Sequence, residues 1–248
     1  MPGTEPLLSA QGPNELDRLR NTYEKREQRY GGTGFYSRSN PGELHRVQSS
    51  ERVLLKLLAR EGSLPLRSQK VLEIGCGSGG LLLQLMASGA TPDLLHGVDL
   101  LEDRIAEARV RLPHLHFICH DAQDLPFEDG MFDLVFQYML FSSVLDDGVR
   151  QRIAREMMRV VRRPAGLIVW YDFWVNPWKK QTRGLRRAAV RKLFPGCSFT
   201  FKSVSLAPPL CRRLAPHSWL ACDALQALRI LNTHTLGAIR PAVRESKP

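Results

Sequence analysis

Four glycines gather at the end of an apolar segment, in the sequence VLEIGCGSGG from residue 71 to residue 80. Gly75, Gly77, Gly79 and Gly80 suit a backbone that turns tightly against a ligand, because a Cβ atom would occupy the ligand's space. The apolar residues before them predict a strand, and GLLLQLMASG after them predicts a helix. The segment therefore predicts a loop that binds a nucleotide cofactor.

The glycine spacing alone admits two cofactors. Gly75, Gly77 and Gly80 satisfy G-x-G-x-x-G, the dinucleotide fingerprint of NAD-dependent oxidoreductases. With Glu73 in front and Gly79 within, the loop also spells E-x-G-x-G-x-G. This longer pattern resembles that of class I S-adenosylmethionine-dependent methyltransferases, and the resemblance covers roughly residues 45–175.

Two acidic residues follow the next two predicted strands in the order typical of that family. Asp99 ends a strand where a carboxylate can accept hydrogen bonds from both ribose hydroxyls, and Asp121 follows the third strand. The resemblance implies that the glycine loop holds the methionine and ribose end of S-adenosylmethionine, that Leu100 packs on the adenine, and that the Cys76 side chain plays no part. The cofactor-binding residues implied in this way are Glu73, Gly75, Cys76, Gly77, Gly79, Asp99, Leu100, Asp121, Ala122 and Gln137.

Methyl transfer depends mainly on positioning two bound reactants, and a base is needed only for a weakly acidic hydroxyl. We expect His217 as the first candidate for that base, and the other candidates are Asp172, Tyr171 and Tyr138. A packing or capping role explains His217 and Asp172 equally well. Aromatic residues are expected to line the acceptor pocket or its lid, although ordinary core packing accounts for them too: Tyr30, Tyr36, Phe141, Trp174 and Trp219.

Several kinds of chemistry lack their motif. The fourth predicted strand is followed by Q-Y-M-L instead of (N/D)-P-P-(Y/F), which argues against methylation of exocyclic amino groups on bases, and no Pro-Cys dipeptide supports cytosine C5 chemistry. The five cysteines are scattered without the short paired spacings of zinc sites or disulfide frameworks. We therefore expect free thiols and no metal.

The C-terminal third resembles a group of bacterial small-molecule methyltransferases, through D-F-x-x-N-P at residues 172–177 and L-F-P-G at residues 193–196. This resemblance implies a hydroxyl or enol acceptor on a sugar or secondary metabolite, and a lid formed by residues 21–39 with glycines 31, 32 and 34 as hinges.

Charge divides the chain unevenly. Residues 1–150 hold 16 Lys and Arg against 21 Asp and Glu, whereas residues 151–248 hold 19 against 4. A basic half suggests nucleic acid, an anionic lipid surface, or an anionic substrate or carrier, unless it only reflects solvated arginine-rich helices. A carrier-tethered acceptor, RNA methylation and a non-catalytic nucleotide-binding protein stay as alternatives, with nucleic acid the less favoured partner because no RNA-binding module is recognisable.

The elements that must position these residues alternate between strand and helix from residue 68 onward. Such alternation predicts a mostly parallel, seven-stranded Rossmann-like α/β sheet flanked by helices. We expect a disordered tail over residues 1–13 and a single domain over residues 14–248, with lid helices at 14–62, the cofactor-binding core at 68–175 and a basic cap at 176–248. Neither a signal peptide nor a transmembrane run is recognisable, so we expect a cytoplasmic protein.

Overall fold

A computed structural model describes residues 15–30, 32–176 and 181–242. The tail expected over residues 1–13 lies outside this range. The helices are α1 (Glu15–Tyr30), α2 (Pro41–Arg60), α3 (Gly80–Ala87), α4 (Glu102–Arg111), α5 (Asp147–Val160), α6 (Arg187–Leu193), α7 (Pro208–Leu214) and α8 (Trp219–Ala227), with 3-10 turns η1 (Leu66–Ser68) and η2 (Pro92–Leu94). The strands are β1 (Val71–Ile74), β2 (Leu95–Asp99), β3 (His116–Cys119), β4 (Leu134–Tyr138), β5 (Leu167–Phe173), β6 (Ser198–Leu206) and β7 (Asn232–Arg240).

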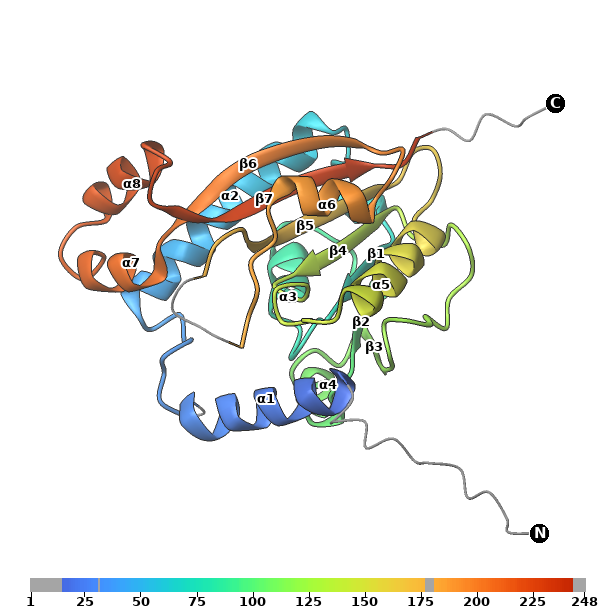
Figure 1. The fold of residues 1–248 in the computed structure, drawn as a ribbon, viewed down its shortest axis with the longest axis horizontal. Helices are drawn as coiled ribbons and strands as arrows, with labels where there is room; N and C mark the ends of the chain where they lie inside the picture. The colour runs from blue at the N-terminus through green and yellow to red at the C-terminus, as the bar shows by residue number, and fades with distance from the viewer. Residues whose placement is uncertain (1–14, 31, 177–180, 243–248) are drawn as a thin grey trace, which may run out of the picture.

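The seven strands form one sheet in the order β3-β2-β1-β4-β5-β7-β6 (Figure 1). The first five strands pair in parallel, and β7 runs antiparallel to both of its neighbours. The strand order reverses at β1, so the glycine loop after β1 opens at the crevice where open α/β sheets bind their ligands. The predicted mostly parallel, Rossmann-like fold is confirmed.

Helices cover both faces of the sheet. On one face, residues of α2, α3 and α4 pack against the sheet around Leu58, Leu82 and Ile105. On the other face, α5 and α6 pack around Ile153 and Phe194. Because water reaches neither face, β5 can be a continuous buried run from Leu167 to Phe173.

Two helices have clear structural limits. Helix α5 ends at Val160, because Val161 pairs with Phe132 as a β-bridge instead of continuing the helix. From residue 181 onward, helical structure begins only at Arg187, since the Leu185 amide donates to the Phe173 carbonyl at 2.9 Å. Gly184 allows this, because a Cβ atom there would lie 2.7 Å from the backbone of Trp174.

The small helices α7 and α8 lie between β6 and β7 and share a separate cluster with Leu206. They project from one end of the molecule beside the start of α2 (Figure 1), and α7 packs on α2. Every helix in the described part of the chain is too short or too polar to span a lipid bilayer.

Candidate active site

The glycine loop is folded back onto β2. Gly75, Gly77 and Gly79 have φ angles of 73°, 52° and 78°, which residues with a Cβ rarely adopt. The amides of Gly75 and Cys76 both donate to the Val98 carbonyl, at 2.8 and 3.0 Å. A Cβ atom on Gly79 would lie 2.8 Å from Leu112, so this glycine is also required by packing. Backbone, not side chains, therefore forms this wall of the site.

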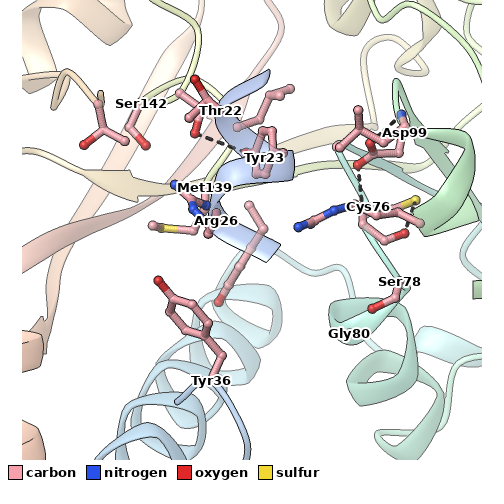
Figure 2. Close-up of a pocket in the computed structure, with 18 of the residues that line it drawn as sticks. Thr22, Tyr23, Arg26, Tyr36, Cys76, Ser78, Gly80, Asp99, Met139 and Ser142 are labelled. Carbon is pink, nitrogen blue, oxygen red and sulfur yellow. Dashed lines mark hydrogen bonds between the residues drawn. The ribbon is translucent and has the colours of Figure 1, made fainter. Parts of the chain in front are cut away.

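Asp99 holds the loop in place from the end of β2. Its Oδ2 accepts a hydrogen bond from the Gly77 amide at 2.8 Å, and its Oδ1 accepts one from the Leu101 amide at 3.0 Å. A carboxylate has about four lone-pair sites, so each oxygen keeps one for a ligand hydroxyl. Figure 2 shows Asp99, Cys76 and Ser78 on one wall of the cavity, facing Met139 and Ser142 across α1.

Glu73 is buried at the end of β1 and lines the same cavity. Burial and the neighbouring Asp99 raise the pKa of this carboxyl well above its usual range. Its Oε2 has no hydrogen-bond partner among the described residues. An unpaired buried acceptor beside a backbone cradle that only glycine can form fits a bound cofactor with donor groups, which is what the predicted role of Glu73 requires.

Asp121 and its neighbours form the far end of this wall. The Asp121 carboxylate accepts from the amide and from the side-chain nitrogen of Gln123, both at 2.9 Å, which fixes its orientation. Leu100 and Ala122 line the cavity beside it. An apolar surface next to an oriented carboxylate suits a flat, amino-bearing base.

One cavity of about 1430 Å³ extends from these groups to α1 and to residues 35–38, within the segment expected to form a lid. Ligand sites typically measure about 300–1,000 Å³, so the space accommodates two reactants. The residues predicted from sequence that line it are Tyr30, Tyr36, Glu73, Gly75, Cys76, Gly77, Asp99, Leu100, Asp121, Ala122 and Tyr138.

Three of the four predicted bases, His217, Asp172 and Tyr171, do not line this cavity. His217 lines a separate depression next to Trp219, between α7 and α8. Asp172 is fully buried, where it accepts hydrogen bonds from the amides of Ser142 at 2.9 Å and Phe173 at 2.8 Å. Burial raises the pKa of Asp172 to about 6. Tyr138 is the predicted base that the structure places in the cavity.

The remaining predicted residues support the walls from behind. Gln137 is buried, and its Oε1 accepts from the Leu140 amide at 3.1 Å. Phe141 packs on Trp170 with ring centroids 4.6 Å apart. The Trp174 indole donates to the Asn232 carbonyl at 2.8 Å. These contacts shape the backbone around the cavity.

A buried polar cluster lies behind Tyr138, and of its members only Tyr171 was a candidate from the sequence. Tyr171 stacks between Tyr138 and His234, at centroid distances of 4.2 and 5.0 Å. Its hydroxyl accepts from Arg46 Nη1 at 3.2 Å and lies 2.8 Å from Ser205 Oγ. His234, a histidine buried in the last strand, completes this cluster.

The lid side of the cavity is strongly basic. Arg212 of α7 lies over the Phe35 ring at 4.0 Å, which connects the cap to the lid. Arg104 and Arg26 flank the Tyr23 ring at 4.8 and 4.9 Å. Four acidic residues line the cavity, Glu43, Glu73, Asp99 and Asp121, against nine basic ones: Arg18, Lys25, Arg26, Arg29, Arg38, Arg46, Arg104, Arg111 and Arg212.

A family model described as a methyltransferase domain matches residues 71–166. This stretch holds the glycine loop after β1, Asp99 at the end of β2 and Asp121 just after β3. Residues 71–166 therefore form a methyltransferase domain with the features of the class I S-adenosylmethionine-dependent kind. The alternative of an NAD-dependent oxidoreductase loses its support, because the E-x-G-x-G-x-G loop belongs to this family.

Curated relatives match about half of this chain in sequence. Phthiotriol/phenolphthiotriol dimycocerosates methyltransferase 1 of Mycobacterium ulcerans is 34% identical over 142 residues, which are 52% of this chain and 48% of the relative. Demethylmenaquinone methyltransferase of Thermotoga maritima is 28% identical over 136 residues, 49% of this chain and 58% of the relative. The chain thus spans about half the length of these proteins.

Solved structures extend the likeness in fold. The PH0226 protein of Pyrococcus horikoshii matches with a TM-score of 0.61 at 20% identity, covering 87% of this chain and 99% of that one. Phosphoethanolamine N-methyltransferase 1 of Haemonchus contortus, solved with phosphoethanolamine and S-adenosylhomocysteine, matches with a TM-score of 0.62 at 18% identity, covering 94% and 51%. At this identity the likeness concerns the fold.

Proposed function

We propose that this protein transfers a methyl group from S-adenosylmethionine to a hydroxyl of a small-molecule acceptor that also carries an anionic group. The observation that carries the proposal is that one cavity has both a cofactor-shaped backbone wall and a basic wall. The first wall comes from Glu73, the glycine loop, Asp99 and residues 121–122, and the second comes mainly from α1, with further basic residues on α2, α4 and α7.

The cofactor would supply an electrophilic methyl on a sulfonium. Asp99 would accept from the ribose hydroxyls with its two free lone pairs, and the Gly75–Gly77 backbone would lie against the methionine end. Glu73 would accept a hydrogen bond at Oε2 from the cofactor. Leu100 and Ala122 would contact the base, with Asp121 oriented by Gln123 toward its amino group.

The basic wall would bind the acceptor's anionic group. Arg38 and Arg212 line the cavity from the lid and from α7. Part of the charge is already compensated, because Glu43 pairs with Arg46 and approaches Arg212 at 3.7 Å. The remaining excess favours a carboxylate or phosphate, whose hydrogen bonds to charged groups contribute about 1.5 to 3 kcal/mol each.

Tyr138 and His234 would handle the acceptor's proton. Burial raises the pKa of Tyr138, so its phenol stays protonated at neutral pH and orients the acceptor hydroxyl. Burial, with a further contribution from Arg46, lowers the pKa of His234 well below its usual value. Its imidazole is therefore neutral at pH 7, so it can accept a hydrogen bond but holds a proton only weakly.

Calorimetric titration with S-adenosylhomocysteine and with NAD tests the first half of the proposal. Tight NAD binding without S-adenosylhomocysteine binding would refute it. The second half is tested by the rate of S-adenosylhomocysteine release with paired hydroxyl compounds of equal size, one bearing a carboxylate or phosphate and one neutral. We expect turnover of the anionic member.

Arg212→Gln then identifies the wall that selects the acceptor. Loss of one charged hydrogen bond should raise KM for the anionic acceptor by about tenfold or more. Arg191→Gln is the matched control, since Arg191 lies over Phe199 and Phe201 outside the cavity. Equal turnover of neutral and anionic acceptors would contradict the basic wall's role. Turnover of a carrier-bound or RNA acceptor alone would refute the proposal that the acceptor is a free small molecule.

A further inference from the structure

Three potential metal ligands converge where the cap meets α2. His45 of α2, Cys211 of α7 and Cys222 of α8 are all buried, and one ligand atom from each lies within 4.8 Å of the other two. Their long separation in the sequence hides the group, which is why the cysteine spacing predicted no metal. The cluster lies outside the residues that line the cofactor cavity.

The distances suit a tetrahedral ion. Zinc binds thiolate sulfur at about 2.3 Å and imidazole nitrogen at about 2.0–2.1 Å, which places adjacent N and S ligands about 3.6 Å apart and two S ligands about 3.8 Å apart. His45 Nδ1 lies 3.5 Å from Cys211 Sγ. All three ligand atoms lie within 4.8 Å of one another, so they need to move together by only about 1 Å to reach these spacings.

The histidine is already oriented for coordination. Its Nε2 lies 2.9 Å from Asp223 Oδ1, so the carboxylate fixes that nitrogen as the donor and leaves Nδ1 as an acceptor facing the sulfur. Arg52 Nη2 contacts the same Asp223 oxygen at 3.2 Å. A carboxylate on the second nitrogen of a ligating histidine is the usual support of zinc sites.

The charges also balance. Cys211 and Cys222 are both free thiols. A divalent ion bound by two thiolates and a neutral imidazole has no net charge, and binding releases two protons to solvent. Such a neutral group is compatible with the apolar cluster that surrounds it, around Leu206 and Ala215.

We propose that His45, Cys211 and Cys222 bind one Zn²⁺ ion that fastens α7 and α8 to α2, with a fourth position left for water. Glu43 and Arg46 of α2 and Arg212 of α7 line the large cavity, so the ion braces its basic wall. The site is independent of the proposed methyl transfer.

The test is titration of the full, reduced chain with Co²⁺, whose bond to thiolate gives a charge-transfer absorption. We expect saturation at one ion per chain and competition by Zn²⁺. Cys211→Ser, Cys222→Ser and His45→Gln should each lose this absorption. Cys197→Ser is the matched control, because Cys197 is a half-buried free cysteine remote from the cluster, and it should keep wild-type binding.

Asp223→Asn should weaken Co²⁺ binding by about 10-fold or more, through the orientation of His45. Zn²⁺ should raise the Tm of the wild type and of Cys197→Ser but not of Cys222→Ser. Circular dichroism and S-adenosylhomocysteine binding report whether each variant folds. If the ligand variants do not fold, X-ray absorption of the zinc-loaded wild type replaces them, with two sulfur ligands and at least one nitrogen ligand expected.

Absence of thiolate-to-cobalt absorption in the folded, reduced wild type would overturn the proposal. So would equal loss of binding in Cys197→Ser, or a zinc environment without sulfur. Formation of a Cys211–Cys222 disulfide together with no metal binding by the reduced chain would also overturn it, and would make the pair a redox site instead.

Discussion

Replacement of Asp99 by alanine removes two interactions at once. The carboxylate holds the glycine loop through the Gly77 amide and the start of α4 through the Leu101 amide, at 2.8 and 3.0 Å. It is also the expected acceptor for the two ribose hydroxyls. Hydrogen bonds to a charged group contribute about 1.5–3 kcal/mol each. We expect Asp99→Ala to weaken S-adenosylhomocysteine binding by about 2 to 4 kcal/mol, which is roughly 30- to 1,000-fold in Kd.

The assay must separate ribose recognition from loop support. Isothermal titration of the wild type and of Asp99→Ala with S-adenosylhomocysteine and with its 2′-deoxy analogue gives a thermodynamic cycle. If Asp99 accepts a hydrogen bond from the 2′-hydroxyl, removing this hydroxyl should reduce the binding free energy of the wild type more than that of the variant. The difference, which is the coupling energy, should be about 1 kcal/mol or more. Asp99→Asn keeps the shape and isolates the charge.

Two results would refute this reasoning. Unchanged affinity of Asp99→Ala would show that the carboxylate does not face the cofactor. Strictly additive losses would show that Asp99 acts only by holding the Gly77 amide, and ribose recognition would then belong to other residues.

Two further predictions concern stability. Gly79→Ala should lower the free energy of unfolding by about 2–4 kcal/mol, because Gly79 has a positive φ and a Cβ atom there would lie 2.8 Å from Leu112. The control is Gly62→Ala, where φ is 69° and the space is open, and it should lower this free energy by only about 1–2 kcal/mol. Urea unfolding measures both values. Equal losses would contradict the packing argument. Burial raises the pKa of Asp172 from 3.8 to about 6 in the folded chain. Between these two pH values the folded chain binds more protons than the unfolded chain, so the free energy of unfolding falls by about 3 kcal/mol as pH rises from one to the other. Asp172→Asn lacks this loss, so its stability relative to wild type should increase from pH 4 to pH 7, and a difference that stays flat with pH would show that Asp172 does not titrate there.

The cofactor wall was predictable because its signals are local. Each of the residues Glu73, Asp99 and Asp121 stands at the carboxyl end of a parallel strand, and parallel strands bring such ends to one edge of the sheet. Alternation of strand and helix therefore sufficed to bring them together before any contact was known.

The acceptor wall was not predictable, since its contacts join distant segments. Arg212 meets Phe35 and Arg46 meets Tyr171 across the fold. The apolar spacing of Val47, Leu54 and Leu58 marks the face of α2 that packs on the core, but it does not indicate which polar residues reach the cavity. His217 shows the same difficulty. It precedes Ser218, which caps α8 by accepting from the Ala221 amide, and this turn places the imidazole outside the large cavity.

The reversed strand β7 makes the cap an interchangeable part. Leu206 of β6 pairs with Asn232 of β7, so residues 207–231 leave and re-enter the sheet at adjacent positions. A hairpin insertion of this kind can change length or sequence without altering the register of the strands it joins. Exchanging this insertion would replace Arg212, one residue of the proposed basic wall, while the glycine loop, Asp99 and Asp121 stay unchanged.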